Sequence, residues 1–182
     1  MGHRSLMFHK ILVALDDSDS SQQVFAEAVA LAKATNASLM LLRVLSPFEG
    51  DYPGSIYPAI NGIYPGLHHE TVQIYVNQWH RFEQEALEAL RSLSRKAIEA
   101  GVSAEFTQNL GDPGRTICEI AHTWNADLVM VGRRGRTGLS EFFLGSVSNY
   151  VLHHAPCSVL TVQGLTQATQ TNKLQPDVAI VR

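Results

Sequence analysis

Charged residues are scarce in this chain. Asp, Glu, Lys and Arg make up 17% of the 182 residues, below the roughly 25% of an average globular domain. Lys and Arg number 14 against 17 for Asp and Glu, so the formal net charge is −3. A chain without a basic excess lacks the charge that drives counterion release from nucleic acid. We therefore expect no nucleic-acid partner.

Cysteine is also rare, and long apolar runs are missing. Cys118 and Cys157 are the two cysteines, and they lie far apart in apolar stretches, which argues against a disulfide framework or a paired-thiol metal site. We interpret them as small core residues in a reducing compartment. No run approaches the roughly 18 apolar residues of a membrane span, and no secretory signal pattern begins the chain. These features predict a cytoplasmic protein that does not bind membranes.

Apolar residues, by contrast, are abundant at 45% of the chain, and disorder is excluded for most of the length. The length favours one domain. We interpret 9–163 as that domain, 1–8 as a leader or a cloning remnant, and the Thr- and Gln-rich residues 164–182 as a flexible tail.

Short apolar stretches alternate along the chain with longer amphipathic ones. Most of the short stretches are apolar throughout, which is typical of parallel strands covered on both faces, whereas one alternates like an edge strand. The predicted strands are 9–17, 38–45, 102–107, 127–132 and 157–162, and the predicted helices are 20–36, 71–100, 112–124 and 145–155. This alternation predicts an α/β fold, an open five-stranded parallel sheet of order 3-2-1-4-5 with helices on both faces.

The predicted helices carry recognisable end signals. Ser20 and Gln23 form a capping-box pattern, and Asn36 is suited to end the same helix. Asp112 followed by proline predicts another helix start, and Gly101 predicts the end of the long helix.

A glycine motif follows the fourth predicted strand. Gly132, Gly135 and Gly145-Ser146 have the spacing G-x2-G-x9-G-S. Glycines let a ligand approach the backbone closely, and a helix N-terminus offers free N–H groups to an anion. The strand order reverses at this point of the sheet, where open α/β sheets bind ligands. The motif predicts a phosphate site; the alternative is that the glycines serve loop turns alone.

These residues resemble the universal stress protein family in its ATP-binding branch. The glycine motif, the opening strand that ends at Asp16, the segment from Ala126 to Gly135 and the end region around Pro156 occur in the family's order, and the resemblance runs from 9 to 163. It implies an adenine nucleotide alpha hydrolase-like fold, a homodimer formed through the last strand, and binding of ATP or of the related nucleotides ADP and AMP.

The resemblance also implies roles for individual residues. The residues that would border adenine and ribose are Ala14, Leu15, Asp16, Val44, Val131 and Gly132. Those that would hold the phosphates are Gly135, Gly145, Ser146, Val147 and Ser148. Arg134 departs from the family pattern, and it either adds a phosphate contact or faces water.

Other candidate sites are weaker. Asp16, with Asp17, is a candidate ligand of Mg²⁺ beside a triphosphate, although for Asp17 a helix-capping role is preferred. Cys118 and His122 are four residues apart, but the preferred interpretation is a core thiol and a surface imidazole. The paired histidines at 68–69 and 153–154 are interpreted as solvated. No catalytic triad can be assigned from spacing.

The segment 46–69 is rich in Pro, Gly and Tyr-Pro pairs and is predicted to be a long loop. It leaves the same edge of the sheet as the predicted site, so it is either a lid or partner-docking surface, or a passive insertion.

The leading hypothesis is therefore a cytoplasmic, dimeric, adenine-nucleotide-binding regulator of the stress response. The alternative is a slow Mg²⁺-dependent ATP hydrolase or phosphoryl-transfer protein that would use Asp16, a metal and an arginine from 133–136. An FMN carrier is disfavoured, because the phosphate motif follows the fourth strand and not the first.

Overall fold

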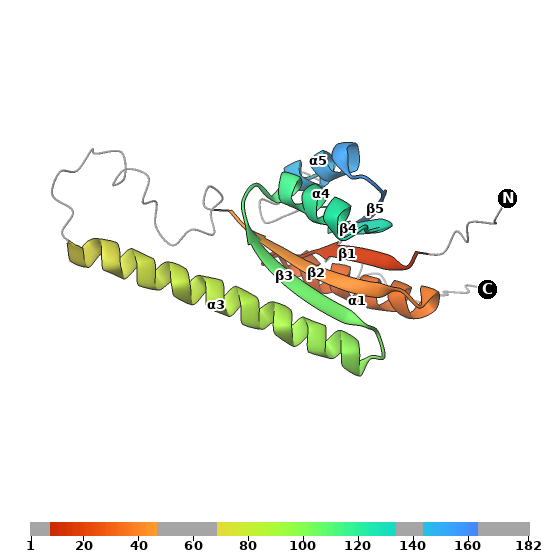
Figure 1. The fold of residues 1–182 in the computed structure, drawn as a ribbon, viewed down its shortest axis with the longest axis horizontal. Helices are drawn as coiled ribbons and strands as arrows, with labels where there is room; N and C mark the ends of the chain where they lie inside the picture. The colour runs from red at the N-terminus through yellow and green to blue at the C-terminus, as the bar shows by residue number, and fades with distance from the viewer. Residues whose placement is uncertain (1–7, 47–68, 134–143, 164–182) are drawn as a thin grey trace, which may run out of the picture.

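The computed structural model describes residues 8–46, 69–133 and 144–163. In these ranges five strands alternate with four helices (Figure 1). The strands are β1 (Lys10–Ala14), β2 (Ser38–Leu45), β3 (Ala104–Leu110), β4 (Leu128–Gly132) and β5 (Ser158–Val162). The helices are α1 (Asp19–Thr35), α3 (His69–Glu99), α4 (Pro113–Thr123) and α5 (Ser146–His154). Residues 1–7 of the predicted leader, nearly all of the predicted loop 46–69 and the predicted tail lie outside the described residues, whereas Phe8 is described and packs against the core.

All five strands are parallel and form one sheet in the order β3-β2-β1-β4-β5. The predicted fold class and strand order are confirmed. β1 lies between β2 and β4, and Val13 pairs with Leu41 on one side and with Met130 on the other. The central position of β1 agrees with its uninterrupted apolar sequence, because a central parallel strand needs cover on both faces.

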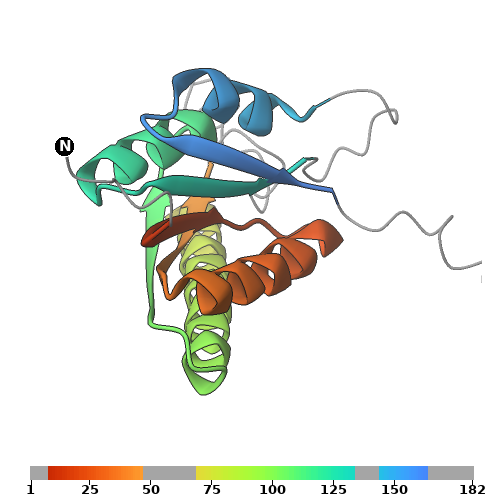
Figure 2. The same cartoon turned by 90° about the vertical axis from the view of Figure 1, so that its right-hand side faces the viewer.

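The helices cover the two faces of the sheet in pairs (Figure 2). On one face, Ile11 and Val13 of β1 pack with residues of α1 and α3. On the other face, Leu12 of the same strand packs with residues of α4 and α5. Alternation of side chains along each strand therefore sends them to two separate cores. Among the described helices, none is both long and apolar enough to span a bilayer.

The predicted helix ends are mostly confirmed. Asn36 adopts a left-handed conformation with φ 56° after α1, and its N–H donates to the Ala32 carbonyl. Gly101 has φ +86° after α3, a conformation that L side chains rarely adopt. The Asp112 carboxylate caps α4 by accepting from the Arg115 N–H at 2.9 Å, with Pro113 in the first position.

The predicted capping box at Ser20 and Gln23 is wrong. α1 begins at Asp19, its N-cap is Ser18, and no side chain caps it. The Gln23 side chain instead donates to Glu27 one turn further along at 3.3 Å. The physical reason is position: α1 begins one residue before Ser20, so Ser20 lies inside the first turn and not at the N-cap, where its hydroxyl could accept from a first-turn N–H.

Candidate functional site

The candidate site lies at the carboxyl ends of β1 and β4, where the strand order reverses. β4 and α5 are tied together at this edge. The Ser148 hydroxyl donates to the Gly132 carbonyl at 2.5 Å, and the Gly145 N–H donates to the Arg133 carbonyl at 2.9 Å. The structure therefore brings Gly132, Gly145, Ser146 and Ser148 to one place, as the sequence predicted.

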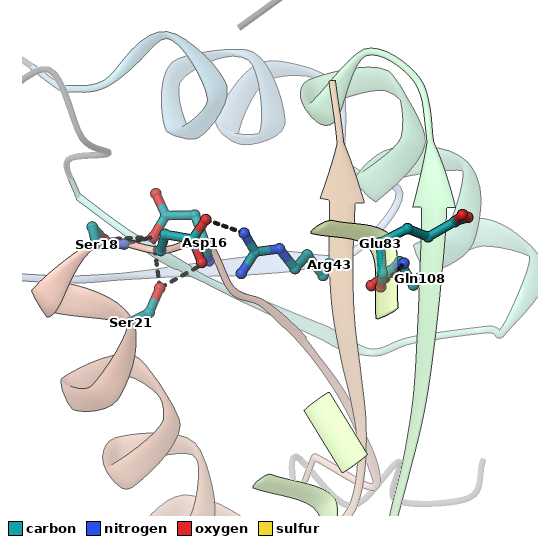
Figure 3. Close-up of polar contacts among 7 residues, drawn as sticks. Asp16, Ser18, Ser21, Arg43, Glu83 and Gln108 are labelled. Carbon is teal, nitrogen blue, oxygen red and sulfur yellow. Dashed lines mark hydrogen bonds and ion pairs between the residues drawn. The ribbon is translucent and has the colours of Figure 1, made fainter. Parts of the chain in front are cut away.

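The turn between β1 and α1 forms the opposite side of the site (Figure 3). Asp16 organises it: its Oδ1 accepts from the Ser18 N–H at 3.0 Å, from the Ser18 hydroxyl and from the Ser21 hydroxyl at 2.6 Å. The Asp16 N–H in turn donates to Ser21 Oγ at 2.9 Å. One carboxylate oxygen thus serves the turn itself and ties it to the first turn of α1 through Ser21.

An apolar surface lies at the same carboxyl ends of the strands. Ala14, Val44, Val131 and Val147 all belong to the core on the α4 and α5 side, and all except Val131 are partly exposed. Leu15 differs from the other predicted residues because its side chain is buried in the core under α1 and α3. Its backbone N–H donates to the Leu42 carbonyl at 2.9 Å. Side chains suited to one face of a planar base therefore come from Ala14 and Val44.

The N-terminus of α5 points its first-turn N–H groups toward this edge. Gly145 is the N-cap, with φ −61° and ψ 155°, and no side chain caps the helix. Backbone N–H groups in a first turn have no partner within the helix and carry partial positive charge, so they suit an anion. The Ser148 hydroxyl is buried and donates to the Gly132 carbonyl, so this side chain links α5 to the end of β4. Arg134 and Gly135, the remaining motif residues, lie outside the described residues.

An ion pair between a buried arginine and a half-exposed aspartate adjoins the β1–α1 turn. The guanidinium of Arg43 on β2 donates to the Asp17 carboxylate. The Arg43 side chain is 7% exposed and that of Asp17 48% exposed. The preferred prediction that Asp17 caps α1 is therefore wrong, because Ser18 occupies the N-cap and Asp17 pairs with Arg43. In the sequence Arg43 is a single charged residue in a mostly apolar strand, and its pairing with Asp17 was not predicted from the sequence.

The described residues contain no group of three or more His, Cys, Asp or Glu side chains that could hold a metal ion. Cys118 is partly buried and His122 is exposed, as the preferred interpretation of that pair requires. Burial raises the pKa of the Cys118 thiol, with a further contribution from Glu119. Burial also raises the pKa of Cys157, and Asp127 and Cys118 add to the effect. Both thiols are therefore weaker nucleophiles at neutral pH than an ordinary cysteine.

The adjacent histidines of α5 are exposed, as predicted. The His154 ring stacks on Tyr150 with centroids 4.1 Å apart, and its Nδ1 lies 2.8 Å from the Tyr150 carbonyl oxygen. The His153 ring meets that of His154 edge-on. This arrangement is a packed aromatic pair at a helix end.

Together, the fold and the site define an open, doubly wound α/β protein with backbone donors gathered at the switch point of its sheet. Residues 7–163 match the model of the Universal stress protein family. The chain belongs to this family.

Individual relatives agree with this assignment. The chain is 40% identical over 156 residues to Universal stress protein Sll1388 of Synechocystis sp., with 86% of this chain and 98% of that protein covered. Among solved structures, universal stress protein UspA from Lactobacillus plantarum superposes with a TM-score of 0.67 at 23% identity, covering 86% of this chain and 98% of that one. At this identity the structural likeness shows the fold.

Two further structural neighbours hold nucleotides. A universal stress protein in complex with cAMP has a TM-score of 0.55 at 24% identity and covers 86% of this chain and 98% of its own. The universal stress protein from Archaeoglobus fulgidus in complex with dAMP has a TM-score of 0.52 at 18% identity, with 86% and 98% covered.

Proposed function

We propose that this protein binds an adenine nucleotide, foremost ATP, at the carboxyl ends of β1 and β4, and that it acts as a homodimeric regulator of the stress response in the cytoplasm. One observation carries the proposal: the uncapped N-terminus of α5 lies against the end of β4, beside the apolar residues that end β1 and β2. An anion site and an apolar surface are the two parts that a nucleotide requires.

The base and the sugar belong at the β1 and β2 side. Ala14 and Val44 would contact the adenine ring, and Asp16 and the Leu15 backbone would border the ribose. Val131 and Gly132 would lie beneath the sugar. Support comes from the partial exposure of Ala14 and Val44 on one face of the sheet.

The phosphates belong at the α5 side. The N–H groups of Ser146, Val147 and Ser148 would bind them, since first-turn amides favour anions. The N–H of Gly145 donates to the Arg133 carbonyl, so Gly145 would instead let the phosphates approach the backbone closely. We extend the same role to Gly135 and Arg134 on the resemblance of the motif. Mg²⁺, where it accompanies a triphosphate, would take Asp16 as its protein ligand and phosphate oxygens for the rest.

The nucleotide complexes of the two structural neighbours support this choice of ligand, because both contain adenine nucleotides on the same fold. Binding, and not turnover, is the proposed activity. Asp16 is the carboxylate that the hydrolase alternative would use, and its Oδ1 already accepts three hydrogen bonds from the turn.

The homodimer would form through β5, the strand at one edge of the sheet. Leu160 on this strand is 41% exposed and Leu152 on α5 is 50% exposed. An exposed apolar edge strand is ready to pair with another chain, so a second copy would cover it.

The ligand can be identified directly. We expect mass spectrometry of the denatured, freshly purified protein to release an adenine nucleotide, and calorimetry of the stripped protein to show binding of ATP, ADP or AMP. GTP is the control for base recognition. A stripped protein that binds none of the three adenine nucleotides would refute the proposal. Incubation of bound ATP over hours, with and without Mg²⁺, separates binding from slow hydrolysis.

A further inference from the structure

A charged residue lies in the core beneath α3. Arg43 is 6% exposed and shares the face of β2 that carries the apolar Leu39 and Leu41. Arginine is almost never buried without a partner, because removing its charge from water is costly. The contacts of Arg43 are therefore expected to have a specific role.

Three elements meet at this guanidinium, and Figure 3 shows its contact with the β1–α1 turn. Arg43 itself comes from β2, its ion-pair partner Asp17 from the β1–α1 turn, and the ring of Phe82, whose centroid is 6.0 Å from the guanidinium carbon, from α3. A cation over an aromatic face is attracted by the ring quadrupole. The planar guanidinium is thus held on one side by Phe82, while its nitrogen donates to Asp17.

The neighbouring strand adds a second polar contact beneath α3. Gln108 of β3 is paired in register with Arg43, and its side-chain nitrogen donates to the Glu83 carbonyl of α3 at 3.1 Å. α3 is therefore attached to the sheet beside Arg43 by a hydrogen bond as well as by apolar packing. This hydrogen bond lies next to Phe82 in the chain and so helps to hold the segment of α3 that faces the guanidinium.

Arg43 is too buried to bind a ligand itself. Asp17, in contrast, is half-exposed and follows Asp16 directly in the turn at the proposed site. The turn is thereby held from two directions. Asp16 holds it from within through Ser18 and Ser21, and Arg43 holds it from β2 through Asp17.

We propose that Arg43 is a positioning residue of the nucleotide site: through Asp17 it fixes the β1–α1 turn in the arrangement that borders the base and the ribose. Phe82 in turn keeps the guanidinium in place, which connects α3 to the site. This inference rests on the proposed function. Its physical basis is preorganisation. A turn that is already ordered in the free protein loses less conformational entropy when the ligand binds, so the affinity is higher.

Two single variants and their combination test the proposal. Arg43→Met keeps a long side chain and removes the charge, and Asp17→Asn keeps the shape of the partner. We expect each to speed amide exchange at residues 16–21 in the nucleotide-free protein and to weaken ATP binding about tenfold. Both substitutions break the same Arg43–Asp17 contact. The double variant is therefore expected to bind ATP about as tightly as whichever single variant binds it less tightly.

Lys10→Met is the matched control. Lys10 also places its ammonium over an aromatic ring, 4.9 Å from the centre of Trp124, and donates to the Trp124 carbonyl at 3.0 Å. This cluster lies at the amino end of β1, whereas the proposed site lies at the carboxyl end of the same strand. We expect the control to change stability alone, with exchange at 16–21 and ATP affinity as in the unmodified protein.

Arg43→Lys provides a conservative variant and is expected to recover part of the affinity that Arg43→Met loses. Folded Arg43→Met or Asp17→Asn protein with unchanged exchange at 16–21 would overturn the proposal, as would strictly additive losses in the double variant. Should Arg43→Met fail to fold, Asp17→Asn decides, because Asp17 is half-exposed. Should the unmodified protein bind no adenine nucleotide, the proposed function fails, and the exchange measurement still decides whether Arg43 holds the turn.

Discussion

At the scale of single residues, Gly114 sets how closely α4 and α5 approach each other. A Cβ atom at this position would lie 2.7 Å from Cδ1 of Tyr150 on α5, closer than atoms in contact can pack. The ring itself is held by the stacked His154. The small residue at the start of α4 is thus a packing requirement.

The Gly114→Ala variant is expected to lose about 1–3 kcal/mol of unfolding free energy, the usual cost of overpacking. Urea denaturation measures this loss, with the exposed Glu119→Ala on the same helix as control. Combining Gly114→Ala with Tyr150→Ala removes the ring that the added methyl group would meet, so the double variant should be more stable than the sum of the two single losses predicts. Additive losses would show that the contact does not limit the helix approach.

The thiol of Cys157 predicts a pH dependence. Burial, Asp127 and Cys118 raise its pKa in the folded protein above the ordinary value of 9.0. The unfolded chain therefore loses the proton first as the pH rises, and the folded state becomes less stable. We expect the unfolding free energy of the unmodified protein, relative to Cys157→Ala, to be constant at lower pH and to fall above this value. Urea titrations across this range measure the difference, and a rise with pH would contradict the assignment.

The residue scale also shows what sequence reasoning could not find. Ser20 and Gln23 satisfy the capping-box pattern locally, but α1 begins at Asp19 with Ser18 at the N-cap, so Ser20 lies inside the first turn. Where the helix begins depends on how the β1–α1 turn folds around Asp16, and a local pattern does not contain that. The Arg43–Asp17 pair did leave a signal: opposite charges near the carboxyl ends of two strands predicted to be neighbours.

At the scale of elements, the start of α5 is the part of the proposed site that a single substitution tests best. Gly145→Val places a branched side chain at the N-cap, where a phosphate would approach. The backbone there is extended, with φ −61° and ψ 155°, so valine fits without strain and the fold should persist. We expect nucleotide affinity to fall at least about tenfold, which corresponds to about 1.4 kcal/mol.

Calorimetry of ATP binding measures that loss. Asn149→Ala, exposed on the same helix beyond its first turn, is the control and should bind ATP as the unmodified protein does. Equal affinity of Gly145→Val and the control would remove the N-terminus of α5 from the proposed site.

The two edges of the sheet offer a paired test of the proposed homodimer. Leu160→Glu places a charge on β5, the strand proposed to pair with a second copy. Leu110→Glu places the same charge on β3 at the other edge, where Leu110 is 59% exposed. Sedimentation at micromolar concentration is expected to show monomers for Leu160→Glu and dimers for the unmodified protein and Leu110→Glu. A monomeric unmodified protein would disprove the dimer.

The elements themselves were the most predictable level. β1, β2 and β4 are mostly apolar, with Arg43 as the one charged residue inside β2, and lie in the middle of the sheet, whereas β3 alternates and lies at an edge. Periodicity and the handedness of parallel crossovers leave few arrangements for such a pattern. Helix boundaries shifted by one or two residues, as with α3, predicted at 71–100 and observed at His69–Glu99.

At the scale of the whole molecule, the proposed site lies at the carboxyl ends of the central strands, and a separate hydrophobic core covers each face of the sheet. The position that we propose for the site follows from the strand order, which the sequence predicted correctly. Its detailed geometry was not predictable, since Leu15 turned out to point into the core under α1 and α3 while Ala14 and Val44 point to the other face. The part of the motif that contains Arg134 and Gly135, and nearly all of the segment 46–69, lie outside the described residues.

The central claim is that an adenine nucleotide binds at the carboxyl edge of β1 and β4. Hydrogen exchange of the stripped protein with and without saturating ATP tests it most directly, because the readout reports the place as well as the binding. We expect protection at 14–18, 131–132 and 145–148, and unchanged exchange at 125–127, beside the starts of β1 and β4. The claim would be contradicted if ATP left exchange at 145–148 unchanged, or if it protected 125–127 at the amino ends of the strands instead.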